Sequence, residues 1–109
     1  MIVQILRNTE TIRYAAEELK KYLLMMDSTT AIDIIYSSEH ISSAVKLGHL
    51  SDFALSDEGV NDSMIDDLID VDIENFCGYI AGSNDRSVLM GVYKYLKNGG
   101  CRWVRPGED

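Results

Sequence analysis

Residues 82–86 form the first of three polar groups in this sequence whose side chains suit binding or catalysis. They read Gly82-Ser83-Asn84-Asp85-Arg86 and lie between a short apolar run and a helical pattern. The free N–H groups of a helix start can hold an anion, but Ser83, Asn84 and Asp85 can also cap the helix themselves. Asp85 adds negative charge, and the phosphate-loop glycines and lysine are missing. We interpret the turn as a helix cap, with contact of Asn84 and Arg86 to a sugar or a neighbouring domain as the alternative.

The second group is an indole ring between two guanidinium groups, formed by Arg102, Trp103 and Arg105. An aromatic ring can stack on a sugar, and arginine can hold a carboxylate with two hydrogen bonds. In the alternative interpretation, Trp103 packs beneath the first helix and the arginines pair with surface acids. We expect substrate or interdomain contact from these three residues together with Asn84 and Arg86.

The third group is an acidic stretch, and its members are Asp57, Glu58, Asp62, Asp66, Asp67, Asp70, Asp72 and Glu74. Two carboxylates about 5 to 9.5 Å apart across a cleft can hydrolyse a glycosidic bond, and clustered carboxylates can bind Ca²⁺. No EF-hand spacing is present, and Asp70, Asp72 and Glu74 alternate along one face of a predicted strand. We interpret the stretch as solvated surface and predict no catalytic residue.

The histidines and cysteines match no metal or nucleophile pattern. His40 and His49 have no His-x-x-x-His or Ser/His/Asp grouping, so we expect each to be a solvent or strand histidine. Cys77 and Cys101 fit no metal-binding spacing. We expect two reduced, buried thiols, although a disulfide is compatible with the sequence. No metal or cofactor is predicted.

Two amphipathic helices are expected to position these groups. In the first helix, apolar residues recur at intervals of three and four and so form one face, while Glu17, Glu18, Lys20 and Lys21 lie on the other face. Asn8 and Thr9 can cap the start of this helix. The apolar face consists of Ile12, Ala15, Ala16, Leu19, Tyr22, Leu23 and Met26. The second helix buries Val88, Leu89, Val92, Tyr93 and Leu96. Gly91 inside it costs about 1 kcal/mol relative to alanine, which predicts close backbone packing there.

The remaining segments predict strands at residues 2–6, 31–36, 44–50, 68–73, 77–81 and 101–105, with a short helical turn near Met64. Asn75 and Phe76 would join two of the strands in an antiparallel hairpin. This order predicts an α+β fold, a mixed sheet of five or six strands with two main helices on one side.

The bulk properties restrict the function classes. At 109 residues the chain is one domain, and its net charge of −8 argues against nucleic-acid binding. No apolar run approaches the roughly 20 residues that span a bilayer, and no signal peptide is visible. We therefore expect an intracellular, cytoplasmic protein with no membrane partner.

Residues 78–109 resemble the end of the N-terminal domain of alpha-glucuronidase-like and beta-hexosaminidase-like glycoside hydrolases. The resemblance is carried by Gly82-Ser83-Asn84, Arg86-Ser87-Val88-Leu89, Val92-Tyr93-Lys94-Tyr95-Leu96 and Arg102-Trp103 through Asp109. The segment Tyr14-Ala15-Ala16-Glu17-Glu18-Leu19 resembles the opening helix of that domain more weakly.

This resemblance implies a non-catalytic accessory domain, residues 1–109, cut from a larger glycoside hydrolase. The domain would precede and support a catalytic (β/α)8 barrel that holds the catalytic carboxylates. The implied substrates are uronic-acid-bearing or similar glycans, and the face exposed without the barrel could form a dimer. The alternative is a free-standing carbohydrate-binding or protein-interaction module.

Overall fold

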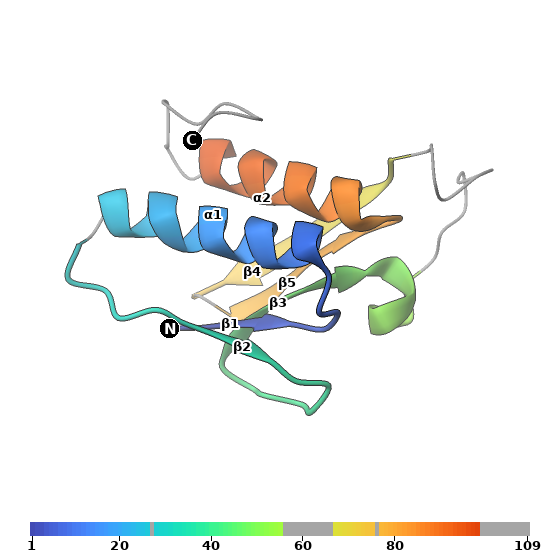
Figure 1. Ribbon diagram of the computed structural model, residues 1–109, viewed down its shortest axis with the longest axis horizontal. Helices are drawn as coiled ribbons and strands as arrows, with labels where there is room; N and C mark the ends of the chain where they lie inside the picture. Colours follow the sequence, from blue (N-terminus) through green and yellow to red (C-terminus); the bar gives the residue numbers. More distant parts are fainter. Residues whose placement is uncertain (27, 56–66, 76, 99–109) are drawn as a thin grey trace.

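The computed structural model describes residues 1–26, 28–55, 67–75 and 77–98. These residues form an α+β fold in which two helices cover one face of a mixed five-stranded sheet (Figure 1). The elements are β1 (Ile2–Ile5), α1 (Glu10–Met26), β2 (Asp33–Tyr36), β3 (Ala44–His49), the 3₁₀ helix η1 (Leu50–Phe53), β4 (Ile69–Glu74), β5 (Cys77–Gly82) and α2 (Asp85–Asn98). The strand predicted at 101–105 and the helical turn predicted near Met64 lie outside the described residues.

The sheet is mainly parallel, with the strand order β2-β1-β3-β5-β4. The strands β2, β1, β3 and β5 run in one direction, and only β4 is antiparallel, paired with β5 from Ile69↔Gly82 to Glu74↔Cys77. The predicted hairpin is therefore confirmed. Asn75 sits in its turn with φ of 55°, a left-handed conformation that asparagine tolerates.

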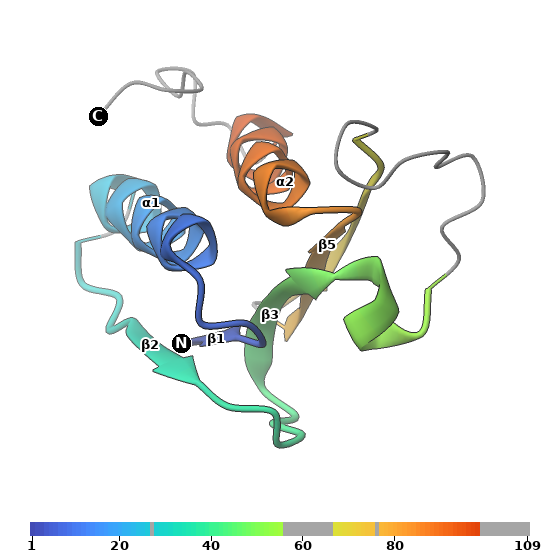
Figure 2. The same cartoon turned by 45° about the vertical axis from the view of Figure 1, so that its right-hand side comes forward.

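The core lies between the sheet and the two helices, which run side by side over it (Figure 2). Val3, Leu47 and Ile80 from three parallel strands are fully buried there. The predicted face of α1 is right except at two positions. Met26 is 47% exposed, because it lies in the last turn of the helix, and Glu18 is only 4% exposed. In α2 the prediction is right except at Leu89, which is half-buried.

Gly91 allows α2 to approach the sheet closely, as predicted from its place inside a helix. A Cβ atom at this position would lie 2.7 Å from Cγ2 of Ile80 and 3.0 Å from Cγ2 of Ile69. The first distance is shorter than real Cβ contacts, and the second is at the tight end of their range. The α2 backbone therefore packs directly on β4 and β5.

We call the side of the sheet that faces away from the helices the second face. Side chains alternate across a strand, so Gln4, Lys46, Tyr79 and Asp72, which are neighbours in register, point to this face. Gln4 is fully buried because the loop after β2 covers it, and its Nε2 donates to the carbonyls of Ser37 and Glu39 at 2.7 Å each.

None of the helices in the described ranges combines the length and the apolar character that crossing a bilayer requires.

Candidate functional site

The carboxyl ends of β1, β3 and β5 meet at one edge of the sheet, and polar residues gather there. Arg7 follows β1, His49 ends β3, and the turn with Asn84 follows β5. In open α/β sheets, ligands bind outside the carboxyl ends of parallel strands. The polar turn identified in the sequence, residues 82–86, lies at this edge and is therefore a candidate for ligand binding.

Asn84 caps α2, which confirms the capping interpretation of the turn. Its Oδ1 accepts a hydrogen bond from the backbone N–H of Ser87 at 2.8 Å, and its Nδ2 donates to Oδ1 of Asp67 at 3.3 Å. Both ends of the side-chain amide are thus used inside the molecule. Contact of Asn84 with a sugar or another domain stays a prediction.

Arg86, the second candidate in the turn, binds Asp67 just before β4. Its Nε and Nη2 donate to Oδ1 of Asp67 at 3.2 and 3.0 Å, and Oγ of Ser87 donates to the same oxygen at 2.7 Å. The hydrogen bond from Ser87, followed by that from Arg86, lowers the pKa of Asp67. Asp67 is exposed, as predicted for this stretch, but three side chains of the turn and α2 also bind it.

His49 is the last residue of β3, which confirms the prediction of a strand histidine, and its side chain also contacts a carboxylate. Its Nε2 lies 2.6 Å from Oδ1 of Asp85 in the first turn of α2, and its backbone N–H donates to Asp52 at 2.8 Å. Asp52 also accepts two hydrogen bonds from Arg7, at 2.8 and 3.0 Å, and this hydrogen bonding raises the pKa of Arg7. This chain of contacts joins the ends of β1, β3 and α2.

Three pairs of ionisable groups lie among the described residues at this edge: Arg7 with Asp52, His49 with Asp85, and Arg86 with Asp67. A ligand that binds any of these six side chains would have to compete with its partner. The arrangement is therefore suited to holding α2 on the sheet in one orientation. Arg102, Trp103 and Arg105 lie outside the described residues.

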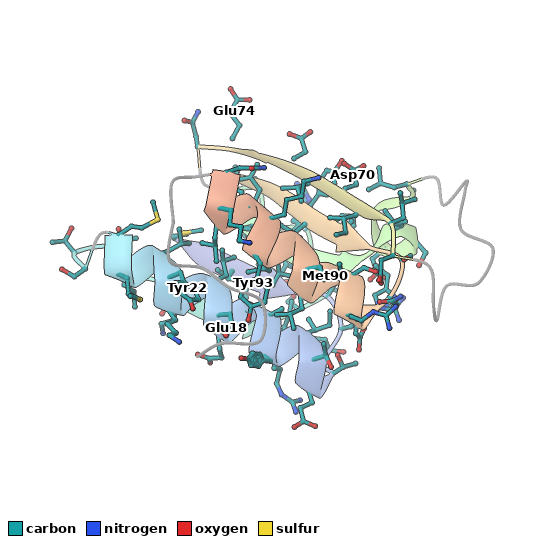
Figure 3. The ribbon with its side chains drawn as sticks, turned by 90° about the horizontal axis from the view of Figure 1, so that it is seen from above. Glu18, Tyr22, Asp70, Glu74, Met90 and Tyr93 are labelled. Carbon is teal, nitrogen blue, oxygen red and sulfur yellow. The ribbon has the colours of Figure 1, made fainter. Side chains whose placement is uncertain are left out.

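A polar site that the sequence analysis missed lies between the two helices. Glu18 accepts hydrogen bonds from the hydroxyls of Tyr14 at 2.7 Å and Tyr93 at 2.9 Å, both on Oε1. Figure 3 shows Glu18 and Tyr93 on the facing sides of α1 and α2. The contact between Tyr14 and Glu18 could have been predicted, because residues four apart are neighbours on a helix. The contact with Tyr93 could not, because that residue is 75 positions away in the sequence.

The outward side of α2 carries a groove of about 600 Å³. Ile69, Leu89 and Tyr93 supply apolar surface, and Met90, labelled in Figure 3, is 40% exposed. The other lining residues are Arg86, Lys94, Lys97 and Asn98.

The second face is also hollowed, on both sides of Tyr79. One hollow of about 330 Å³ contains Lys46, Phe53 and Cys77, and the ring of Phe53 stacks on that of Tyr79 with centroids 4.9 Å apart. A second hollow, of about 640 Å³, extends from Tyr79 to Asp72 and Glu74. Cys77 is a free thiol as predicted, but it is half-buried, and it donates to the carbonyl of Ser42 at 2.8 Å. Cys101 lies outside the described residues.

The pKa of the Tyr79 phenol is raised by burial and by the nearby carboxylates of Asp70 and Asp72. Its hydroxyl donates to Asp70 at 3.3 Å. The predicted alternation of β4 is confirmed, since Val71 and Ile73 pack against the core while Asp72 and Glu74 are exposed.

Comparison of the chain with models of known protein families gives no match, and neither does comparison with curated protein sequences.

Proposed function

We propose that this chain is a non-catalytic accessory domain whose second face packs against the catalytic barrel of a carbohydrate-active enzyme. The observation that carries the proposal is a mainly parallel sheet with both helices on one face. All-parallel sheets occur almost only where both faces are covered, and four of the five described strands here are parallel. Among the described residues, two segments contact the second face. The loop after β2 binds Gln4, and Phe53 of η1 stacks on Tyr79.

The side chains on the second face suit an interface between domains. Phe53, Tyr79 and Ile41 are half-buried and apolar or aromatic, while Lys46 and Asp72 add charges of both signs. Interfaces between domains of one chain typically bury about 600–1,500 Å² and are more polar than permanent interfaces. The two hollows beside Tyr79 offer depressions into which side chains of a second domain can insert.

The identity of the second domain rests on the resemblance of residues 78–109 to the N-terminal domains of alpha-glucuronidase-like and beta-hexosaminidase-like enzymes. The substrate would then be a uronic-acid-bearing or similar glycan, bound in the barrel. Asn84, Arg86, Arg102, Trp103 and Arg105 remain the proposed contacts to substrate or barrel. The proposal requires a barrel in the same full-length polypeptide, and its absence would refute the proposal.

The test is to produce this chain and the barrel as separate polypeptides and to measure their dissociation constant by calorimetry. Lys46→Glu and Asp72→Lys each reverse a charge on the second face, and we expect each to weaken binding by about tenfold, which corresponds to 1.4 kcal/mol. Glu17→Lys, on the exposed side of α1, is the matched control and should leave binding unchanged. Equal binding by all variants would contradict the assignment of this face.

A free-standing carbohydrate-binding module is the second candidate, and the stacked Phe53 and Tyr79 rings beside a hollow favour it. Aromatic side chains bury a large apolar area and contribute strongly to the energetics of interfaces. Titration of the chain alone with glucuronic acid and its oligosaccharides would decide between the candidates. Saturable binding that Phe53→Ala abolishes would support a binding module, and no binding would support the accessory-domain proposal.

A further inference from the structure

We propose that the groove on the outward side of α2 docks an amphipathic helix that carries acidic residues, from a partner protein. This surface lies on the helical side of the sheet, opposite the second face. The proposal concerns a different partner, and it is tested at Met90, Lys94 and Lys97, which are not among the proposed barrel contacts. Three observations carry it: the helical spacing of the lining residues, their apolar floor and their charge.

The groove follows one face of α2. Arg86, Leu89, Met90, Tyr93, Lys94 and Lys97 recur at intervals of three and four residues. From Arg86 to Lys97 the groove extends about 16 Å, which is three turns at 1.5 Å per residue. Helices pack by fitting the ridges of one into the grooves of the other, and a three-turn partner helix matches this length.

The floor of the groove is apolar and partly open to solvent. Leu89 is half-buried against the core, Ile69 lines the groove at the start of β4, and Met90 is 40% exposed. Methionine adapts its shape to a partner, because it is unbranched and has three rotatable bonds. An apolar stripe on the partner helix would remove Met90 and Leu89 from water.

The charge of the groove selects an acidic partner. The chain has a net charge of −8, yet α2 places Arg86, Lys94 and Lys97 along the groove. Arg86 pairs with Asp67, whereas neither Lys94 nor Lys97 pairs with a carboxylate of the described residues. Complementary charges at the rim of an interface steer association and suppress wrong partners.

A second copy of the chain fits this groove poorly. If the outward sides of two α2 helices packed antiparallel about a two-fold axis midway between residues 86 and 97, Arg86 of each copy would face Lys97 of the other. Like charges placed opposite one another across an interface destabilise it. Helix pairs of opposite charge avoid this cost, and for this reason we assign the groove to an acidic helix of a different protein.

The probe is a fluorescein-labelled helical peptide of about four turns, with leucines at i, i+3, i+4 and i+7 and glutamates at the other positions. Binding to the full chain is followed by fluorescence anisotropy at low salt. We expect saturable binding that weakens about tenfold for Met90→Glu and about threefold for each of Lys94→Glu and Lys97→Glu. Lys20→Glu, a matched charge reversal on α1, should leave binding unchanged.

Several outcomes would overturn the proposal. They are the absence of saturable binding at about 1 mM peptide, equal binding of a peptide with lysines in place of the glutamates, and binding that Met90→Glu does not change. A concentration-dependent dimer that Met90→Glu abolishes would instead identify a second copy as the occupant. Circular dichroism of each variant checks that it is folded. Lys46→Glu tests the second face separately, so failure of one proposal leaves the other standing.

Discussion

Removal of the Tyr93 hydroxyl tests the buried contact that joins the two helices. Glu18 is 4% exposed and Tyr93 is 2% exposed, and the hydroxyl lies 2.9 Å from the carboxylate. A hydrogen bond to a charged group contributes about 1.5–3 kcal/mol, and a buried carboxylate that loses a donor is not rescued by water. We expect Tyr93→Phe to lower the free energy of unfolding by about 2 kcal/mol. At about 4 °C per kcal/mol for a domain of this size, Tm should fall by about 8 °C.

The assay is urea unfolding followed by circular dichroism, with an unchanged m-value as evidence that only stability has changed. Tyr36→Phe is the matched control, because Tyr36 is 61% exposed. Removal of its hydroxyl should lower the free energy of unfolding by less than about 0.5 kcal/mol. A double-mutant cycle of Tyr93→Phe with Glu18→Gln should give a coupling energy of about 1 kcal/mol or more. A Tyr93→Phe cost no larger than that of the control, or a coupling near zero, would refute the reasoning.

Three further substitutions test the packing and the edge network. Gly91→Ala should destabilise the fold by about 1–3 kcal/mol in urea unfolding, despite the better helix propensity of alanine. The reason is that the new Cβ would meet the fully buried Ile80. Asp67→Asn should make stability less sensitive to acid. The pKa of Asp67 lies below its ordinary value of 3.8, so its ionised form stabilises the fold above about pH 3.8, and this contribution disappears as the pH falls through the lowered pKa. The free energy of unfolding, measured between about pH 2 and 6, should therefore fall less steeply for the variant than for the original chain. Equal slopes would contradict this expectation. Asn84→Ala should cost about 1 kcal/mol, whereas Asn84→Ser should retain most of the cap; a thermal scan that finds the two variants equal would show that the cap contributes little.

The sequence predicted those parts of the fold that depend on local pattern. The helical spacing from Ile12 to Leu23 and the hairpin around Asn75 are visible within a few residues, and both are confirmed. Gly91 was also informative, because a glycine inside a helix is costly unless the backbone packs closely. The mixed sheet with two helices follows from these elements.

The contacts that the sequence did not predict join distant positions. Glu18 looks solvated by residue type, and it is buried because Tyr93 donates to it from the other helix. His49 and Asp85 are similarly separated, and parallel pairing of β3 with β5 brings them to one edge. A one-dimensional pattern records polarity but not the partner, so the paired network at the sheet edge could not be recognised.

The arrangement of the parallel strands has a consequence for the folding kinetics of the chain. Ile2 pairs with both Asp33 and Ala44, and Val45 pairs with Gly78, so closing the centre of the sheet requires long loops to form first. The β4–β5 hairpin and the adjoining α2 are local, and local contacts form fastest. The transition state should therefore resemble this C-terminal unit, and the first strand should join the native structure late.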